Sequence, residues 1–318
     1  MRNALLFPLL LLLITSCMDE ANFEAVTNPP VDNSRAESGD LIIISGGNVA
    51  ATATPFPLHK IALFSNTGKF KRFLYEAATA AQYLYGGDLD PATFELVFTT
   101  ENIDRLQRID LASNTLLPDV NDANLNGTTM RAMALLSNGD RLVAESATVL
   151  EKYTAAGVRA TAPFPITIPT AINSVRAISG GRFVVTFTTN PDQPRVYTEA
   201  GVLQGTFANS ACTTNCDPFD VLELSDGRFV ISARVGNTLY LYNADRSYVG
   251  VLYNNTSLMQ GPSALAQLPN GNILACNTTF NTCEQLAISG NSATRVGSKA
   301  YIDNASAMRQ PMKVIVVP

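Results

Sequence analysis

A repeated pattern of apolar and polar positions runs through most of the chain. Its unit is an apolar residue, a short polar turn that ends in glycine, and a strand rich in Val, Ile, Phe or Leu. Such a unit is typical of a β-hairpin whose turn needs a residue that tolerates positive φ. Four copies align by eye: LLSNGDRLVAES from Leu135, AISGGRFVVTFTT from Ala177, ELSDGRFVISAR from Glu223 and QLPNGNILACNT from Gln267. Their glycines, Gly139, Gly181, Gly227 and Gly271, are spaced by 42, 46 and 44 residues.

This period is typical of one four-stranded propeller blade per repeat. The pattern continues upstream in residues 92–100 and 38–45, and QPMKVIVVP ends the chain where another such strand is due. After all but the last of these strands, a further strand and often a turn follow, which we interpret as the outer strands of each blade. Six intervals separate Leu41 from Lys313. We therefore predict an all-β, six-bladed β-propeller, closed by pairing of the N- and C-terminal strands, with seven blades as the alternative.

Two sets of apolar residues keep the same place in every aligned repeat, and we expect both to pack between blades. They are Met133, Val175, Val221 and Leu265, followed three residues later by Leu136, Ile178, Leu224 and Leu268. The whole unit, with its second hairpin of the form x-x-x-Y/F/D-x-x-G, resembles the NHL and YncE-like propeller repeats. The resemblance covers about residues 40–318 and implies a fold rather than an activity.

The N-terminus reads as a secretory signal. Met1-Arg2-Asn3 precedes an apolar run of 11 residues from Ala4 to Ile14, too short for the roughly 20 residues of a membrane span. The run ends in Thr15-Ser16-Cys17, which resembles the bacterial lipoprotein box, where the cysteine is acylated and becomes the new N-terminus. We expect a lipoprotein signal peptide over 1–16 and a lipid on Cys17; an ordinary signal peptide is the alternative.

The segment 17–39 is polar and contains Pro29-Pro30, so it buries too little apolar surface to offset its ordering entropy. We expect a flexible tether between the lipid on Cys17 and a propeller over 40–318. These features place the protein in the bacterial cell envelope, attached to a membrane through its lipid. The residue after Cys17 is Met18 rather than an acidic residue, which favours the outer membrane; the periplasmic or surface face stays open.

Charge and cysteine content narrow the classes of partner. The chain is 46% hydrophobic and 15% charged with a net charge of −5, which disfavours a nucleic-acid partner. Beyond Cys17, the cysteines form two close pairs, and in an oxidising compartment we expect two local disulfides, with zinc as the rival interpretation. The pairs are Cys212 with Cys216 and Cys276 with Cys283.

Polar residues that lead into the innermost strands are candidates for a site at the mouth of the central channel. They are Asp88, Arg131, Asn173, Asp220 and Ser263. Gluconolactonase and regucalcin-like lactonases hold a divalent cation at such a mouth with Glu, Asn and Asp side chains. Asp88, Asn173 and Asp220 are similar to that set in residue type, although no local run matches the family's signature. The alternative is that these residues solvate a wet channel.

Asp122-Ala123-Asn124-Leu125-Asn126-Gly127 spells the first half of a calcium loop. Counted from Asp122, positions 9 and 12 are Met130 and Met133, where such a loop needs oxygen ligands. We therefore expect no cofactor and interpret the segment as an Asx-rich turn between blades. Calcium bound by Asp122, Asn124 and Asn126 is the alternative.

No catalytic motif stands out. The only histidine is His59, and the chain has no G-x-S-x-G, H-E-x-x-H or phosphate-loop pattern. We therefore expect a non-catalytic envelope lipoprotein whose rigid propeller face binds a protein, a glycan or another envelope component. A metal-dependent hydrolase of the lactonase type, acting at the channel mouth, is the alternative.

Overall fold

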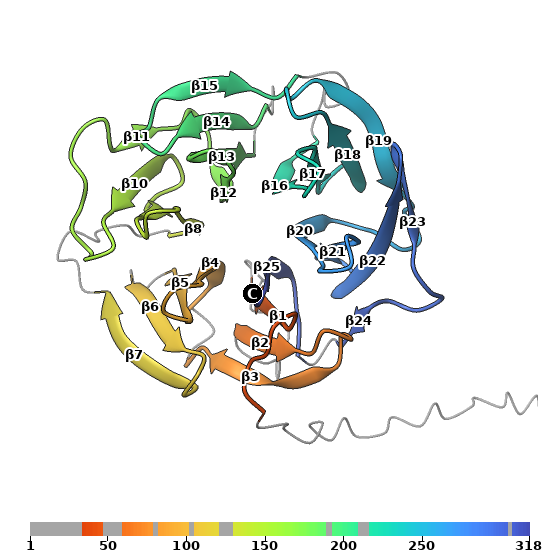
Figure 1. The fold of residues 1–318 in the computed structure, drawn as a ribbon, viewed down its shortest axis with the longest axis horizontal. Helices are drawn as coiled ribbons and strands as arrows, with labels where there is room; N and C mark the ends of the chain where they lie inside the picture. The colour runs from red at the N-terminus through yellow and green to blue at the C-terminus, as the bar shows by residue number, and fades with distance from the viewer. Residues whose placement is uncertain are drawn as a thin grey trace, which may run out of the picture. The chain divides into compact units, whose positions relative to one another are not determined.

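The computed structural model describes residues 34–46, 59–78, 82–101, 105–120, 130–188, 193–208, 216–304 and 307–318. Every regular element in these ranges is a β-strand, and the strands form six antiparallel sheets arranged as a ring (Figure 1). The described residues include no helix with the length and hydropathy needed to cross a bilayer. The expected signal peptide, Cys17, Cys212 and the calcium candidates Asp122, Asn124 and Asn126 lie outside the described residues.

Each sheet is one blade, numbered here from the N-terminus. Blade 1 contains β1 (Leu41–Ser45), β2 (Lys60–Phe64), β3 (Phe70–Glu76) and β25 (Pro311–Val316). Blade 2 contains β4 (Leu84–Asp90), β5 (Glu95–Thr100), β6 (Arg105–Asp110) and β7 (Thr115–Val120). Blade 3 contains β8 (Met133–Leu135), β9 (Arg141–Ala144), β10 (Val149–Tyr153) and β11 (Ile166–Thr167).

The second half of the ring follows the same plan. Blade 4 contains β12 (Ile172–Ile178), β13 (Arg182–Phe187), β14 (Arg195–Thr198) and β15 (Leu203–Thr206). Blade 5 contains β16 (Pro218–Glu223), β17 (Phe229–Ala233), β18 (Thr238–Tyr242) and β19 (Tyr248–Asn254). Blade 6 contains β20 (Pro262–Gln267), β21 (Ile273–Asn277), β22 (Thr282–Ser289) and β23 (Ser292–Arg295), and the short β24 (Ile302–Asp303) also pairs with β22.

The ring closes between the two ends of the described chain, as the sequence predicts. β25 pairs antiparallel with β1, with Leu41 opposite Val316 and Ile43 opposite Val314. The C-terminal strand is therefore the innermost strand of blade 1, and the C-terminus lies near the ring axis (Figure 1). The closure confirms six blades and excludes seven.

The hydrophobic core is divided into six clusters, one at each interface between neighbouring blades. Val221 packs between blades 4 and 5, and Leu265 packs between blades 5 and 6. Both residues are fully buried, and burial of each such side chain stabilises the fold by roughly 1.5–3 kcal/mol. All eight residues expected to pack between blades are buried.

The turn and the cysteine predictions also hold where the structure describes them. Gly139, Gly181, Gly227 and Gly271 have φ of 83°, 65°, 84° and 83°, the left-handed conformation that their turns require. Cys276 and Cys283 face each other on β21 and β22 and form a disulfide with a Cα–Cα distance of 3.9 Å. Cys216 is also disulfide-bonded.

The last residues of the expected tether contact the propeller. The Gly39 N–H donates to the Val317 carbonyl at 2.8 Å, and the Lys71 ammonium donates to the Asp40 carboxylate at 2.9 Å and to the Arg35 carbonyl at 3.1 Å. Lys71 is almost fully buried, so these contacts hold the chain against blade 1. The folded body therefore begins near Arg35, a few residues before the expected boundary at 40.

Candidate functional site

Six inner strands surround the ring axis, and a pocket lies at the end of the axis where these strands begin. We call it the axial pocket; it has a volume of about 310 Å³, at the lower end of the roughly 300–1,000 Å³ typical of small-molecule sites. All six blades contribute to its lining. From blade 1 to blade 6, the lining includes Met312, Tyr85, Arg131, Asn173, Phe219 and Thr278.

The two cations that line the axial pocket have different surroundings. The Arg234 guanidinium bonds the Asp217 carboxylate, with nitrogen–oxygen distances of 2.6 and 2.7 Å, and lies 4.9 Å above the Phe219 ring centroid. Asn173 Nδ2 donates to the other carboxylate oxygen of Asp217 at 2.8 Å. Asp217 therefore neutralises Arg234 and holds it in place.

Arg131 has no such partner. Within the part of the chain that the structure describes, its side chain makes no hydrogen bond or ion pair, and its Nε atom is buried. Its guanidinium carbon lies 6.0 Å from the Tyr85 ring centroid, at the outer limit of a cation–π contact. A buried N–H without an acceptor costs free energy, so this side chain is suited to receiving an acceptor from a ligand.

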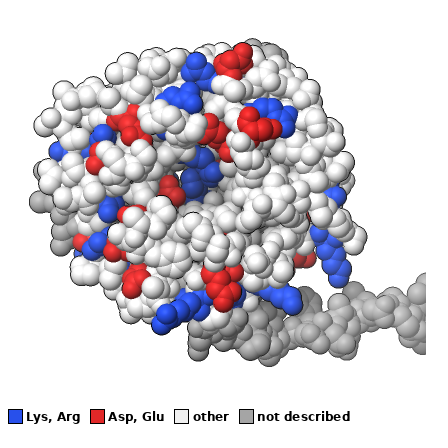
Figure 2. Space-filling view, in the orientation of Figure 1, with Lys and Arg blue, Asp and Glu red and all other residues white. Residues whose placement is uncertain are grey.

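A second, larger pocket lies at the end of the axis where the inner strands finish. We call it the opposite pocket; it has a volume of about 720 Å³ and is lined by Asp88, Arg176, Glu199 and Glu223 among others. Figure 2 shows basic and acidic side chains side by side in the central hollow. Glu223 and Glu199 accept hydrogen bonds from Ser179 and Ser137 in the neighbouring blades, so these acids link blades.

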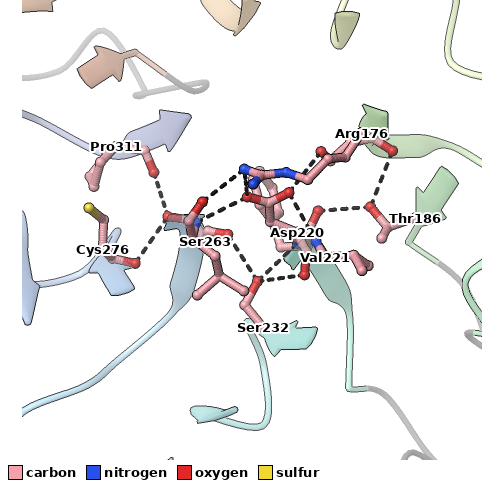
Figure 3. A network of polar contacts seen from close by, with 11 residues as sticks. Arg176, Thr186, Asp220, Val221, Ser232, Ser263, Cys276 and Pro311 are labelled. Atoms are coloured by element: carbon pink, nitrogen blue, oxygen red, sulfur yellow. Dashed lines mark hydrogen bonds and ion pairs between the residues drawn. The ribbon is translucent and has the colours of Figure 1, made fainter. Parts of the chain in front are cut away.

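A buried polar network near the axis joins the inner strands β12, β16, β20 and β25 (Figure 3). The Asp220 carboxylate accepts hydrogen bonds from the N–H groups of Val221 and Leu265, at 2.9 and 3.0 Å, and pairs with the Arg176 guanidinium at 2.8 Å. The Ser263 hydroxyl donates to the carbonyls of Cys276 and Pro311. Asp220 and Ser263 therefore connect blades, and a ligand would have to break this network to reach them.

Lys313 on β25 is buried near the same network. Burial and the nearby Arg176 charge lower the pKa of its ammonium group, against the opposing effect of Asp220 and Asp88. Because the folded-state pKa lies below the ordinary value of 10.5, the fold binds fewer protons than the unfolded chain. The contribution of Lys313 to the free energy of unfolding therefore rises as the pH increases toward 10.5.

Lys313→Met is expected to abolish this rise. Urea unfolding of the wild-type chain and of the variant, followed by circular dichroism between about pH 7 and pH 9.5, would measure the slope of the free energy of unfolding against pH for each protein. This range stays below the ordinary tyrosine pKa, which burial raises further for Tyr242. Equal slopes in the two proteins would show that Lys313 carries no proton-linked stability.

The five channel-mouth candidates are distributed over three environments. Arg131 and Asn173 line the axial pocket, Asp88 lines the opposite pocket, and Asp220 and Ser263 belong to the buried network. The Asp88 carboxylate accepts hydrogen bonds from the N–H groups of Leu89 and Leu135, which links blades 2 and 3. In the residues that the structure describes, no group of three or more His, Cys, Asp or Glu side chains is placed to hold a metal ion.

Sequence reasoning missed the aromatic and apolar residues of the axial pocket, Tyr85, Ile172, Phe219 and Met312, as well as Arg234. A signal for Phe219 was present. Arg131 and Asn173 stand two residues before the packing residues Met133 and Val175, and Phe219 stands two residues before Val221. The candidate chosen in that strand, Asp220, is one residue later, and neighbouring residues of a strand point to opposite faces.

The fold and the pockets define a class: a six-bladed β-propeller with a small polar pocket on its axis. No protein-family model and no curated protein sequence matches the chain. Several solved structures are similar to the chain. A chain of the nidogen/laminin complex is similar with a TM-score of 0.65 and 11% identity, over 86% of this chain and 97% of that one.

Two bacterial β-propeller proteins are also similar. A protein of unknown function from Bacteroides caccae has a TM-score of 0.59 and 14% identity, over 87% of this chain and 98% of that one. A catalytically inactive variant of virginiamycin B lyase from Staphylococcus aureus, solved with quinupristin, has a TM-score of 0.56 and 13% identity, over 70% of this chain and 72% of that one. At these identities the likeness shows the fold alone.

Proposed function

We propose that the protein is a non-catalytic binding protein of the bacterial cell envelope, tethered to a membrane by a lipid on Cys17, that takes up an envelope component in the axial pocket. The observation that carries this proposal is the axial pocket itself. All six blades contribute residues to it, and Arg131 makes no side-chain hydrogen bond or ion pair with the part of the chain that the structure describes. A rigid ring that presents uncommitted polar groups in one pocket is suited to recognition without rearrangement.

The side-chain arrangement supports binding over the lactonase alternative. A hard cation would need several oxygen ligands in one place, but Asp88, Asn173 and Asp220 lie in different environments and are bonded to other groups. The lyase in the comparison has an inactive variant in which a histidine is replaced by alanine. The only histidine here, His59, packs edge-on against Tyr83 with ring centroids 4.7 Å apart, and it is not among the residues that line either pocket.

The proposal is tested by retention of envelope material on the immobilised full chain. Tyr85→Ala is expected to reduce retention about tenfold or more, because an aromatic side chain at the centre of an interface typically dominates its binding energy. The matched control is Tyr248→Ala, which removes a partly exposed tyrosine on the outer strand β19. Equal retention by the wild-type chain and both variants would refute a role for the axial pocket.

A further inference from the structure

The axial pocket carries one uncompensated positive charge. Among the residues that the structure describes, its lining includes Arg131 and Arg234 and no Asp or Glu side chain. Asp217, directly behind the lining, offsets Arg234 through the ion pair described above. Arg131 is therefore the cation that is left for a ligand, and it presents a planar fork of N–H donors that matches a carboxylate or phosphate.

The rest of the lining offers neutral polar groups and flat apolar surface. The hydroxyl of Thr188 and the side-chain amide of Gln310 make no hydrogen bond within the described part of the chain. The Asn173 amide uses its Nδ2 group on Asp217 and Pro218, which leaves its oxygen to accept a hydrogen bond. Tyr85 adds partly exposed aromatic surface. Such a set suits a ligand with several hydroxyl groups on a compact ring.

We propose that the component bound in the axial pocket is an acidic sugar, that is, a sugar ring with a single carboxylate that pairs with Arg131. The inference rests on the proposed function and narrows its ligand to one chemical class. A carboxylate brings one negative charge, which matches the single positive charge of Arg131, the lining cation without an ion-pair partner among the described residues. A phosphomonoester brings about −1.5 to −2 at neutral pH, and its second charge would have no partner. The pocket volume of about 310 Å³ accommodates a ligand of this size.

Binding of defined sugars to the full chain tests the inference. The probes are glucuronate and galacturonate, the neutral sugars glucose and galactose, and the two hexose 6-phosphates, each titrated by calorimetry or by ligand-observed NMR. We expect at least one uronate to bind about tenfold or more tightly than its neutral counterpart, because hydrogen bonds to charged groups are the strong ones. Salt should weaken this preference.

Variants of Arg131 identify the group responsible. Arg131→Gln is expected to abolish the preference for the uronate without lowering the thermal unfolding temperature, since the side chain makes no hydrogen bond or ion pair with the described residues that could be lost. Arg131→Lys should restore part of the preference, because lysine carries the positive charge but lacks the planar N–H donors of the guanidinium group. The matched control is Arg195→Gln: Arg195 also lies over an aromatic ring, 5.4 Å from the Phe187 centroid, but outside the axial pocket.

Two results would overturn the inference: no difference between the uronates and the neutral sugars, including no binding of either, or tighter binding of the hexose 6-phosphates. A preference for the uronate that persists in Arg131→Gln would overturn the role of Arg131. A different result would refute the proposed function. If Tyr85→Ala does not reduce retention of envelope material, the pocket is not the binding site, whereas pocket-dependent retention that uronates do not inhibit removes only the acidic sugar.

Discussion

Asp220→Ala is expected to lower the free energy of unfolding by about 3–5 kcal/mol, the usual cost of removing one partner of a buried ion pair. Asp220 is 1% exposed, and its carboxylate accepts hydrogen bonds from two N–H groups and pairs with Arg176. Without the Asp220 carboxylate, the Arg176 guanidinium loses its ion-pair partner near the axis. The loss should appear in urea unfolding followed by circular dichroism.

Asp226→Ala is the matched control. Asp226 also pairs with an arginine, Arg228, at 2.7 Å, but its side chain is 50% exposed. Exposed ion pairs contribute about 0–1 kcal/mol, so this variant should unfold almost like the wild-type chain. If Asp220→Ala were as stable as Asp226→Ala, the network near the axis would not be what holds the inner strands together.

Gly86→Ala is expected to destabilise the ring by about 3 kcal/mol, at the upper end of the usual overpacking penalty. A Cβ atom on Gly86 would lie 2.6 Å from the Met133 nitrogen and 2.8 Å from the Ala132 Cα. These are backbone atoms of the neighbouring blade, so no side chain can rotate away. The inner strands β4 and β8 would have to separate.

Gly250→Ala makes the same change where the structure has room. Gly250 lies on the outer strand β19, and a Cβ atom there meets nothing within 4 Å. This variant should be unchanged or up to about 1 kcal/mol more stable, because alanine restricts the unfolded chain. Equal thermal stability of Gly86→Ala and Gly250→Ala would contradict the close approach of blades 2 and 3.

The fold was predictable because its signals are local and repeated. The glycine at each first turn is required by a backbone conformation, and the apolar residues six and three positions before that glycine are buried in all four aligned repeats. The closing strand was found from its place in the repeat, which identified residues 313–318 as the partner of Leu41–Ser45. The contacts of Arg35 and Gly39 could not be predicted in the same way, because their partners, Lys71 and Val317, are distant in sequence.

The site was only partly predictable because the polarity of a residue does not show which face of its strand it occupies. Charge predicted that Asp88 and Asp220 lie at the channel mouth. In the structure, each carboxylate instead accepts a hydrogen bond from a backbone N–H group of the neighbouring blade. Phe219 lines the axial pocket at the position next to Asp220, and no composition rule separates an aromatic ligand contact from a core residue. The position of Arg131 was predictable from the repeat, but only the structure shows that its side chain makes no hydrogen bond or ion pair within the described residues.

The most direct test of the account is hydrogen–deuterium exchange of the full chain with and without the retained envelope material. We expect protection at the starts of the inner strands, around Tyr85, Arg131, Asn173, Phe219 and Met312, with no change at the turns that carry Ser137, Ser179 and Ser225. Protection confined to those turns, or no protection near the axial pocket, would contradict the claim that the protein binds its ligand there.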